Sequence, residues 1–200
     1  MIDLNSKTQA LYTHLFFAGF FCIGIAYFFT MFCQGKIRKR VFNGEFMSQF
    51  NTEHQDAFNC NAPGGGYPDM GNGYYSEKLS YQDWFTFNNW QRAHMNFLEG
   101  FAMFVTLMII ASINAPIMSA IASILYAVGR VLYGLGYMSG GPKGRIFGAI
   151  LSILALFTAC IGAIWSLVAW NKTDTLNPDD TYKIYPISLV KFEKVFFPRV

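Results

Sequence analysis

Four apolar segments constrain this chain more than any other feature. A bilayer's hydrocarbon core is about 30 Å thick, and crossing it as an α-helix takes about 20 apolar residues. Segments of roughly this length cover residues 10–33, 97–113, 115–138 and 146–170 of the 200-residue chain. The second segment begins as helix upstream of Arg92, and only Arg130 interrupts the third. We therefore expect an all-α integral membrane protein built as a four-transmembrane-helix bundle.

The N-terminus lacks the charged region and small-residue cleavage site of a secretory signal, so we expect the first helix to remain in the mature protein. The four cysteines include no C-x-x-C pair, and three of them lie within or at the ends of apolar segments. We interpret them as small buried hydrophobic residues, with no disulfide or metal framework. They are Cys22, Cys33, Cys60 and Cys160.

Basic residues gather beside two of the apolar segments. Residues 36–40 follow the first segment, and Lys143 and Arg145 follow the third. Because four segments alternate in direction, both groups lie on one side of the membrane. The positive-inside rule assigns that side to the cytosol or a matrix-like compartment and places both termini opposite. A basic run beside a membrane is also typical of a simple anchor on anionic lipid.

Two polar regions extend this membrane domain, which we place at residues 1–170. The insert, residues 43–83, contains a run rich in glycine and proline over 63–73 and has too little apolar content for a core of its own. Because it has no phosphate-binding glycine motif, we expect a surface loop that docks on another surface and does not bind phosphate. Residues 171–200 are polar at first and then mix apolar and charged side chains, which predicts a C-terminal docking tail.

One stripe of the second segment is polar. If the segment is helical, Arg92, Asn96 and Glu99 fall at positions i, i+4 and i+7 and share one face. Such a stripe can bind a zwitterion, and ionisable groups inside a membrane usually face the bundle interior or a wet cavity. The alternative is a structural ion pair that holds helices together.

The third segment carries a matching stripe. Arg130, Tyr133 and Tyr137 recur at i, i+3 and i+7, in the half of the helix nearest the basic side. Both stripes would meet at one depth, within reach of Arg38 and Arg145. This set suits a small peptide-like anion, because arginines pair with carboxylates and a hydroxyl or guanidinium stabilises developing negative charge. Tyrosines near an interface are also typical of an aromatic belt.

The sequence contains no serine triad, paired carboxylate dyad or metal-binding cluster that competes with these stripes. The strings 91–99 and 129–137, followed by Gly140-Gly141-Pro142 before Arg145, resemble the membrane-associated proteins in eicosanoid and glutathione metabolism, the MAPEG family. Within that family the resemblance is strongest to the type 3 microsomal glutathione S-transferases. It covers about residues 11–170, and the basic run 36–40 resembles the turn that ends the family's first helix.

This resemblance implies a homotrimer whose active sites lie between subunits. Glutathione would bind near the cytosolic face as co-substrate, and an apolar acceptor would enter from the lipid. Arg145 would be catalytic, because a nearby guanidinium favours the nucleophilic thiolate. His94 would line the site and a neighbouring subunit would contribute Arg38. The remaining candidate ligands of glutathione are Arg92, Asn96, Glu99, Arg130, Tyr133 and Tyr137.

The sequence also departs from the family pattern. Gly100 stands where the leukotriene C4 synthase branch places a tyrosine, which argues against that branch's specific activity. The loop over 143–147 has fewer basic residues than its counterpart in the type 3 enzymes. Insert and tail extend well beyond the family pattern.

Three functions are compatible with these observations. The first is a glutathione-dependent membrane transferase or peroxidase that acts on lipophilic electrophiles or lipid hydroperoxides. The second is a structural accessory subunit of a larger membrane complex, such as a mitochondrial one, that uses insert and tail to contact unlike subunits. The third is a non-catalytic lipid-binding relative. We expect membrane lipids and a lipophilic small molecule as partners, no nucleic acid and no metal, and a location in the endoplasmic reticulum or mitochondrial membrane.

Overall fold

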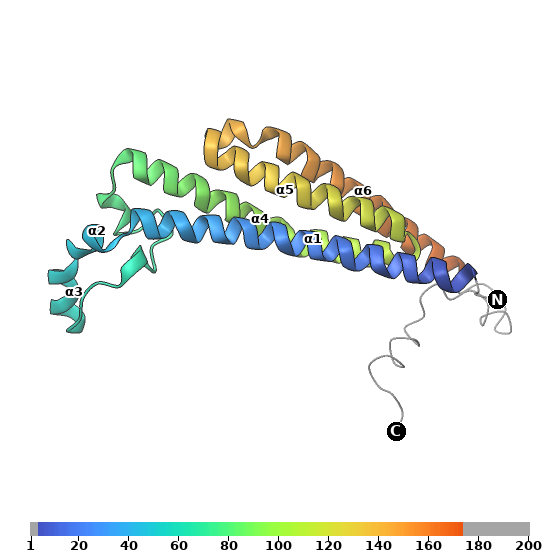
Figure 1. Cartoon of the computed structure of the whole chain (residues 1–200), viewed down its shortest axis with the longest axis horizontal. Coiled ribbons are helices and arrows are strands. Elements are labelled where there is room, and N and C mark those ends of the chain that lie inside the picture. The colour runs from blue at the N-terminus through green and yellow to red at the C-terminus, as the bar shows by residue number, and fades with distance from the viewer. Residues whose placement is uncertain (1–3, 174–200) are drawn as a thin grey trace, which may run out of the picture. The chain divides into compact units, whose positions relative to one another are not determined.

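Four long helices make up most of the protein, in a computed structural model that describes residues 4–173 and the side chains of residues 11–170 (Figure 1). They are α1 (Leu4–Val41), α4 (Tyr81–Asn114), α5 (Pro116–Gly144) and α6 (Ile146–Thr173). All four are long and apolar enough to cross a membrane, and the described part of the chain contains no strand. The predicted all-α membrane fold is confirmed. Apart from its first residues, the predicted docking tail lies outside the described residues.

The helix ends follow from local sequence chemistry. α1 continues beyond the apolar segment through the basic run, because basic side chains in a last turn complement the partial negative charge of a helix C-terminus. α4 ends at Asn114 and α5 begins at Pro116, which is favoured at the first position of a helix. Gly141 has a φ of 62°, so the end of α5 bends there before Arg145 connects it to α6.

The chain forms two compact units, and each long helix contributes to both. Of the described residues, the first unit comprises 4–23, 101–127 and 151–173, and the second comprises 24–100 and 128–150. All four cysteines are free, but the expectation that they are buried is wrong, because Cys60 of the insert is exposed and the other three are half-buried. Both basic segments and every candidate site residue belong to the second unit.

Small side chains allow close helix packing in the first unit. A Cβ atom on Gly19 of α1 would lie only 2.6 Å from the Cβ atom of Ser123 on α5. At the far end of α4, the Nδ2 atom of Asn114 donates to the carbonyl oxygen of Ser166 at 3.1 Å. Small residues and short polar links of this kind hold helices together in lipid, where apolar side chains gain little by leaving the bilayer.

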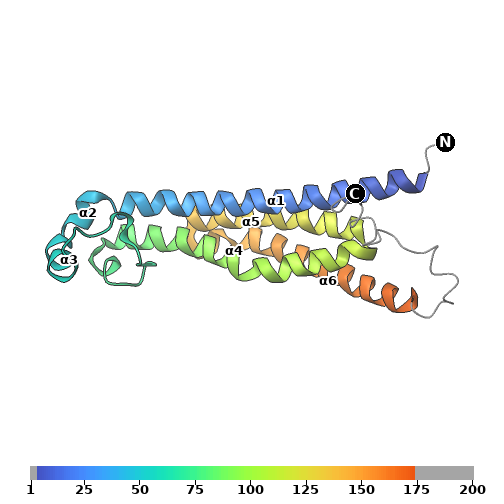
Figure 2. The same cartoon turned by 90° about the horizontal axis from the view of Figure 1, so that it is seen from below.

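The insert between α1 and α4 is more ordered than its composition predicts. It contains the short helices α2 (Gly44–Ser48) and α3 (Asn51–Phe58) and two single 3₁₀ turns, η1 (Gly64–Gly66) and η2 (Ser76–Lys78). Figure 2 shows α2 and α3 beyond the C-terminal end of α1, in the region where α4 starts. The expectation of a plain surface loop therefore missed these short helical elements, which are too short to show a clear apolar period.

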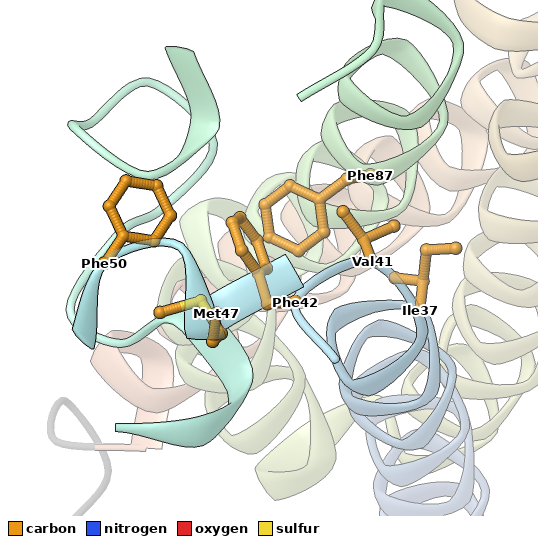
Figure 3. Close-up of a cluster of buried hydrophobic side chains, with 6 residues drawn as sticks. All are labelled: Ile37, Val41, Phe42, Met47, Phe50 and Phe87. Atoms are coloured by element: carbon orange, nitrogen blue, oxygen red, sulfur yellow. The ribbon is translucent and has the colours of Figure 1, made fainter. Parts of the chain in front are cut away.

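An apolar cluster fastens the insert to the rest of the second unit (Figure 3). Its side chains come from the end of α1, from the insert and from the start of α4. The rings of Phe42 and Phe87 meet edge to face, with centroids 5.1 Å apart. The insert thus shares one apolar core with the end of α1 and the start of α4. The buried members are Ile37, Val41, Phe42, Met47, Phe50 and Phe87.

A buried carboxylate organises the second half of the insert. Asp69 Oδ1 accepts the backbone N–H groups of Gly71 at 2.7 Å and Gly73 at 3.0 Å. Ser76 donates its backbone N–H to Oδ2 at 2.7 Å and its hydroxyl to Oδ1 at 2.5 Å. Burial by itself raises the pKa of Asp69, but these hydrogen bonds, above all those from Ser76, outweigh burial and hold that pKa below its ordinary value.

We predict that Asp69→Asn destabilises this part of the insert by about 1–3 kcal/mol, because an amide nitrogen cannot accept the backbone N–H of Ser76. The wild-type contribution is complete above the ordinary aspartate pKa of about 3.9 and is lost as the pH falls through the lower folded value. The variant should lack this acid-dependent loss. Amide hydrogen exchange over residues 64–80, corrected for the intrinsic rate, measures both effects.

The matched control for this experiment is Asp56→Asn, which changes an exposed carboxylate on α3. Equal protection of residues 64–80 in Asp69→Asn and in the control would contradict the role assigned to Asp69.

Candidate active site

Three polar groups meet at the hydroxyl of Tyr133 on α5, a residue that is only 5% exposed. Asn96 of α4 donates from Nδ2 to this oxygen at 2.6 Å. Arg145, in the connection between α5 and α6, donates from Nη1 to the same oxygen at 2.8 Å. Two donors occupy both acceptor positions of a phenol oxygen, while its own proton remains available for donation.

A second guanidinium, that of Arg130, packs against the ring of Tyr133. Arg130 is buried, and its Nη2 atom donates to the backbone carbonyl oxygen of Asn96. Its Cζ atom lies 5.0 Å from the ring centroids of both Phe97 and Tyr133. Cation–π contacts of this kind contribute about 2 kcal/mol when desolvated. Arg130 therefore provides a fixed positive charge inside the second unit.

Close backbone packing brings Arg145 to this position. A Cβ atom on Gly148, in the first turn of α6, would overlap the backbone of Tyr133, so only glycine permits this approach of α6 to α5. The Cζ atom of Arg145 lies 5.3 Å from the ring centroid of Tyr137. The hydrogen bond to Tyr133 raises the pKa of Arg145, which lies between the spanning helices, so the side chain stays cationic.

We call these five residues the Tyr133 group. The structure brings them together from α4, α5 and the connection before α6, as the spacing of the two polar stripes predicted. With two guanidinium groups and two phenols, the group is suited to an anion or to a centre that becomes negative during reaction. No metal-binding cluster occurs among the described residues. The members are Asn96, Arg130, Tyr133, Tyr137 and Arg145.

Two further predicted residues lie on the same stripe of α4 but on the surface of this chain. Arg92 and Glu99 are both exposed, one turn before and one turn after Asn96. Exposed charges on a membrane-spanning helix are costly in lipid, at about 2.5–3.5 kcal/mol each on insertion scales. Their exposure in a single chain thus favours a neighbouring polar surface.

His94 faces α1 and has a different set of contacts. It is buried, and its Nδ1 atom lies 3.2 Å from the Oγ1 atom of Thr30. Its ring packs against that of Tyr27, with centroids 5.6 Å apart. One turn later on α1 and one turn earlier on α4, Gln34 donates from Nε2 to Oε1 of Gln91 at 2.6 Å.

The sequence interpretation missed this contact between α1 and α4, although the sequence contained a signal for it. Thr30, Gln34 and Arg38 recur every four residues on α1 and form a polar stripe of their own. The apolar length of α1 predicts a membrane span but does not predict which polar residues of that span contact α4.

Arg38 lies beneath the insert and is almost fully buried. It donates from Nη1 to the carbonyl oxygen of Gly65 at 3.2 Å, and from Nη2 towards the sulfur of Met70 at 3.9 Å. Its Cζ atom lies 4.3 Å from the ring centroid of Tyr67 and 4.9 Å from that of Phe87. These partners belong to the insert and to the start of α4, and the structure does not join Arg38 to the Tyr133 group.

Comparison with known proteins identifies one family. The family model of MAPEG matches residues 15–165, a range that includes every member of the Tyr133 group. No curated protein and no solved structure matches the chain.

We predict that Arg38→Met loosens the insert by about 2 kcal/mol, because methionine keeps much of the apolar stem but loses the contacts with the two rings and Gly65. Glutathione affinity should change little. Amide exchange of the insert and isothermal titration with glutathione measure the two effects, and Arg40→Met, an exposed neighbour, is the control. A fall in affinity with an undisturbed insert would instead support the subunit-bridging role that the resemblance implies.

Proposed function

This chain is a member of the MAPEG family, and from that membership we propose that it is a glutathione-dependent transferase or peroxidase of lipophilic electrophiles or lipid hydroperoxides. Family membership and the four spanning helices make it an integral membrane protein related to glutathione and eicosanoid metabolism. The strings 91–99 and 129–137 support assignment to the type 3 branch, in the endoplasmic reticulum or mitochondrial membrane.

The arrangement around the Tyr133 hydroxyl carries this proposal. Its oxygen accepts hydrogen bonds from Asn96 and Arg145, so its proton points to a partner outside the pair. A bound thiolate is a fitting acceptor, because the phenol proton and the Arg145 charge both favour the anionic sulfur over the thiol. A free thiol has a pKa of about 8.5, so this stabilisation increases the reactive fraction at neutral pH.

The thiolate then acts as the nucleophile. In conjugation its sulfur forms a bond to an electrophilic carbon, and the leaving group departs with the bonding pair. In peroxide reduction the sulfur attacks the terminal oxygen and the O–O bond breaks, which releases an alcohol and leaves a sulfenic acid on glutathione. A second glutathione converts that sulfenic acid to the disulfide and water.

The rest of the tripeptide requires charged partners outside the Tyr133 group. Arg92 can pair with a glutathione carboxylate, and Glu99 can accept its ammonium group. Both are exposed in a single chain, which supports a homotrimer in which a neighbouring subunit covers them. In this arrangement Arg130 supplies the positive charge of the wall beside Tyr137, and the apolar acceptor enters from lipid.

The alternative is a structural accessory subunit of a larger membrane complex. Exposed aromatic side chains on the insert favour it, since Phe58 is 68% exposed and Tyr74 is 57% exposed. Wild-type protein that forms no thiolate and copurifies stoichiometrically with unlike subunits would support this alternative.

We predict that Arg145→Ala lowers kcat/KM for conjugation of glutathione with a small aryl halide by about 10²–10³-fold near neutral pH, the usual effect of removing one preorganised charge or donor. The deficit should shrink above about pH 8.5, where the free thiol ionises without help. Lys143→Ala, which changes an exposed cation two residues away, should retain activity.

Tyr133→Phe separates the two contributions, because it removes the phenol proton and keeps the guanidinium. Ultraviolet absorbance of the thiolate, followed during glutathione titration, should weaken in both Tyr133→Phe and Arg145→Ala. Full conjugating activity in Arg145→Ala would overturn the catalytic assignment.

A further inference from the structure

We propose that a pocket between the insert and the first turn of α4 binds the quaternary ammonium of a choline phospholipid headgroup. The pocket has a volume of about 330 Å³. It shares no residue with the Tyr133 group, so this inference does not rest on the proposed function. The lining residues are Asn72, Gly73, Ser76, Glu77, Leu79, Tyr81 and Trp84.

One wall of the pocket is a pair of aromatic rings. Tyr81 and Trp84 have ring centroids 5.9 Å apart and planes inclined by 30°, so two neighbouring aromatic rings line the pocket. The indole of Trp84 is held in place, because its Nε1 atom donates to the carbonyl oxygen of Gly71 at 3.0 Å. Tryptophan and tyrosine faces attract cations, and quaternary ammonium groups are characteristic ligands of such surfaces.

A carboxylate is the one charged side chain among the lining residues. Glu77 belongs to η2, where its backbone N–H donates to the carbonyl oxygen of Gly73 at 3.3 Å. The neighbouring Ser76 hydroxyl donates to Asp69, so η2 is fixed from beneath. Charge attraction to the carboxylate and cation–π contact with the rings both work without a hydrogen bond. The two together can therefore bind a quaternary ammonium, which has no N–H groups.

The pocket lies at the depth of lipid headgroups. α5 is straight from Pro116 to its bend at Gly141, so it is roughly 38 Å long, more than the roughly 30 Å of the hydrocarbon core, and its end reaches the headgroup layer. Near its end, a Cβ atom on Gly141 would lie 3.6 Å from Cζ of Phe85, the residue after Trp84. The first turn of α4 thus lies just past the end of α5, at the outer edge of the headgroup layer (Figure 1). At this depth a choline headgroup is the quaternary ammonium that matches both walls.

The test measures lipid retention by the purified full-length chain. After exchange into a nonionic detergent and addition of equimolar phosphatidylcholine, phosphatidylethanolamine and phosphatidylglycerol with identical acyl chains, native mass spectrometry counts the bound lipids. We expect wild type to retain phosphatidylcholine preferentially. Glu77→Gln and Tyr81→Leu should each reduce that preference by about threefold to fivefold.

Matched controls make the same kinds of substitution at insert positions outside the pocket. Glu45→Gln removes an exposed carboxylate of α2, and Phe58→Leu removes an exposed ring of α3. Both should retain wild-type selectivity. Because Glu77 and Tyr81 are exposed, their variants are expected to fold, and amide exchange of the insert verifies this.

Soluble phosphocholine distinguishes the source of the ligand. If it displaces bound phosphatidylcholine from wild type and not from Glu77→Gln, the headgroup pocket is supported. If soluble phosphocholine binds but phosphatidylcholine is not retained, a lipid source is refuted. Equal retention of phosphatidylcholine and phosphatidylethanolamine, or wild-type selectivity in Glu77→Gln, overturns the proposal of a quaternary ammonium site.

Discussion

Polar side chains on membrane-spanning helices need partners within the protein, and this requirement governs the second compact unit. Lipid offers no hydrogen bonds, so polar groups buried among the helices are most stable when they find partners within the protein. The hydroxyl of Tyr133 satisfies Asn96 and Arg145 at once, and the carbonyl of Asn96 accepts from Arg130. These contacts tie α4, α5 and the start of α6 together. The groups that would bind an anion are therefore also the groups that hold these helix segments in register.

The insert meets the same requirement by different means. Arg38, at the end of α1, lies between aromatic rings and donates to Gly65, while Asp69 accepts four hydrogen bonds within the insert itself. Buried charges of either sign are costly unless they are hydrogen-bonded or paired. Because both charges have partners in the insert, the insert has a defined shape and can present an ordered surface beside the first turn of α4.

The sequence predicted the fold well and the site in part. Apolar length identified the four spans, and the i, i+4 and i+3 spacings placed Asn96, Arg130 and Tyr133 on faces that do meet. The contact of Thr30 with His94 was missed, although the stripe of Thr30, Gln34 and Arg38 on α1 indicates it, because the apolar length of α1 predicts only a membrane span. The position of Arg38 was not predictable either, because its surroundings include Gly65 and Phe87, which lie 27 and 49 positions later in the chain. Helices as short as α2 leave too little periodicity to recognise.

Hydrophobicity and helical periodicity act over short stretches of chain, and they determined by themselves that this protein has four spanning helices with polar stripes on α1, α4 and α5. Only tertiary structure decided which polar atoms pair, because that depends on how closely backbones approach, as at Gly148 beside Tyr133. It also decided that Arg38 is enclosed by the insert, and that Glu77, Tyr81 and Trp84 line one pocket. Such juxtapositions arise from packing between distant segments, which no local pattern encodes.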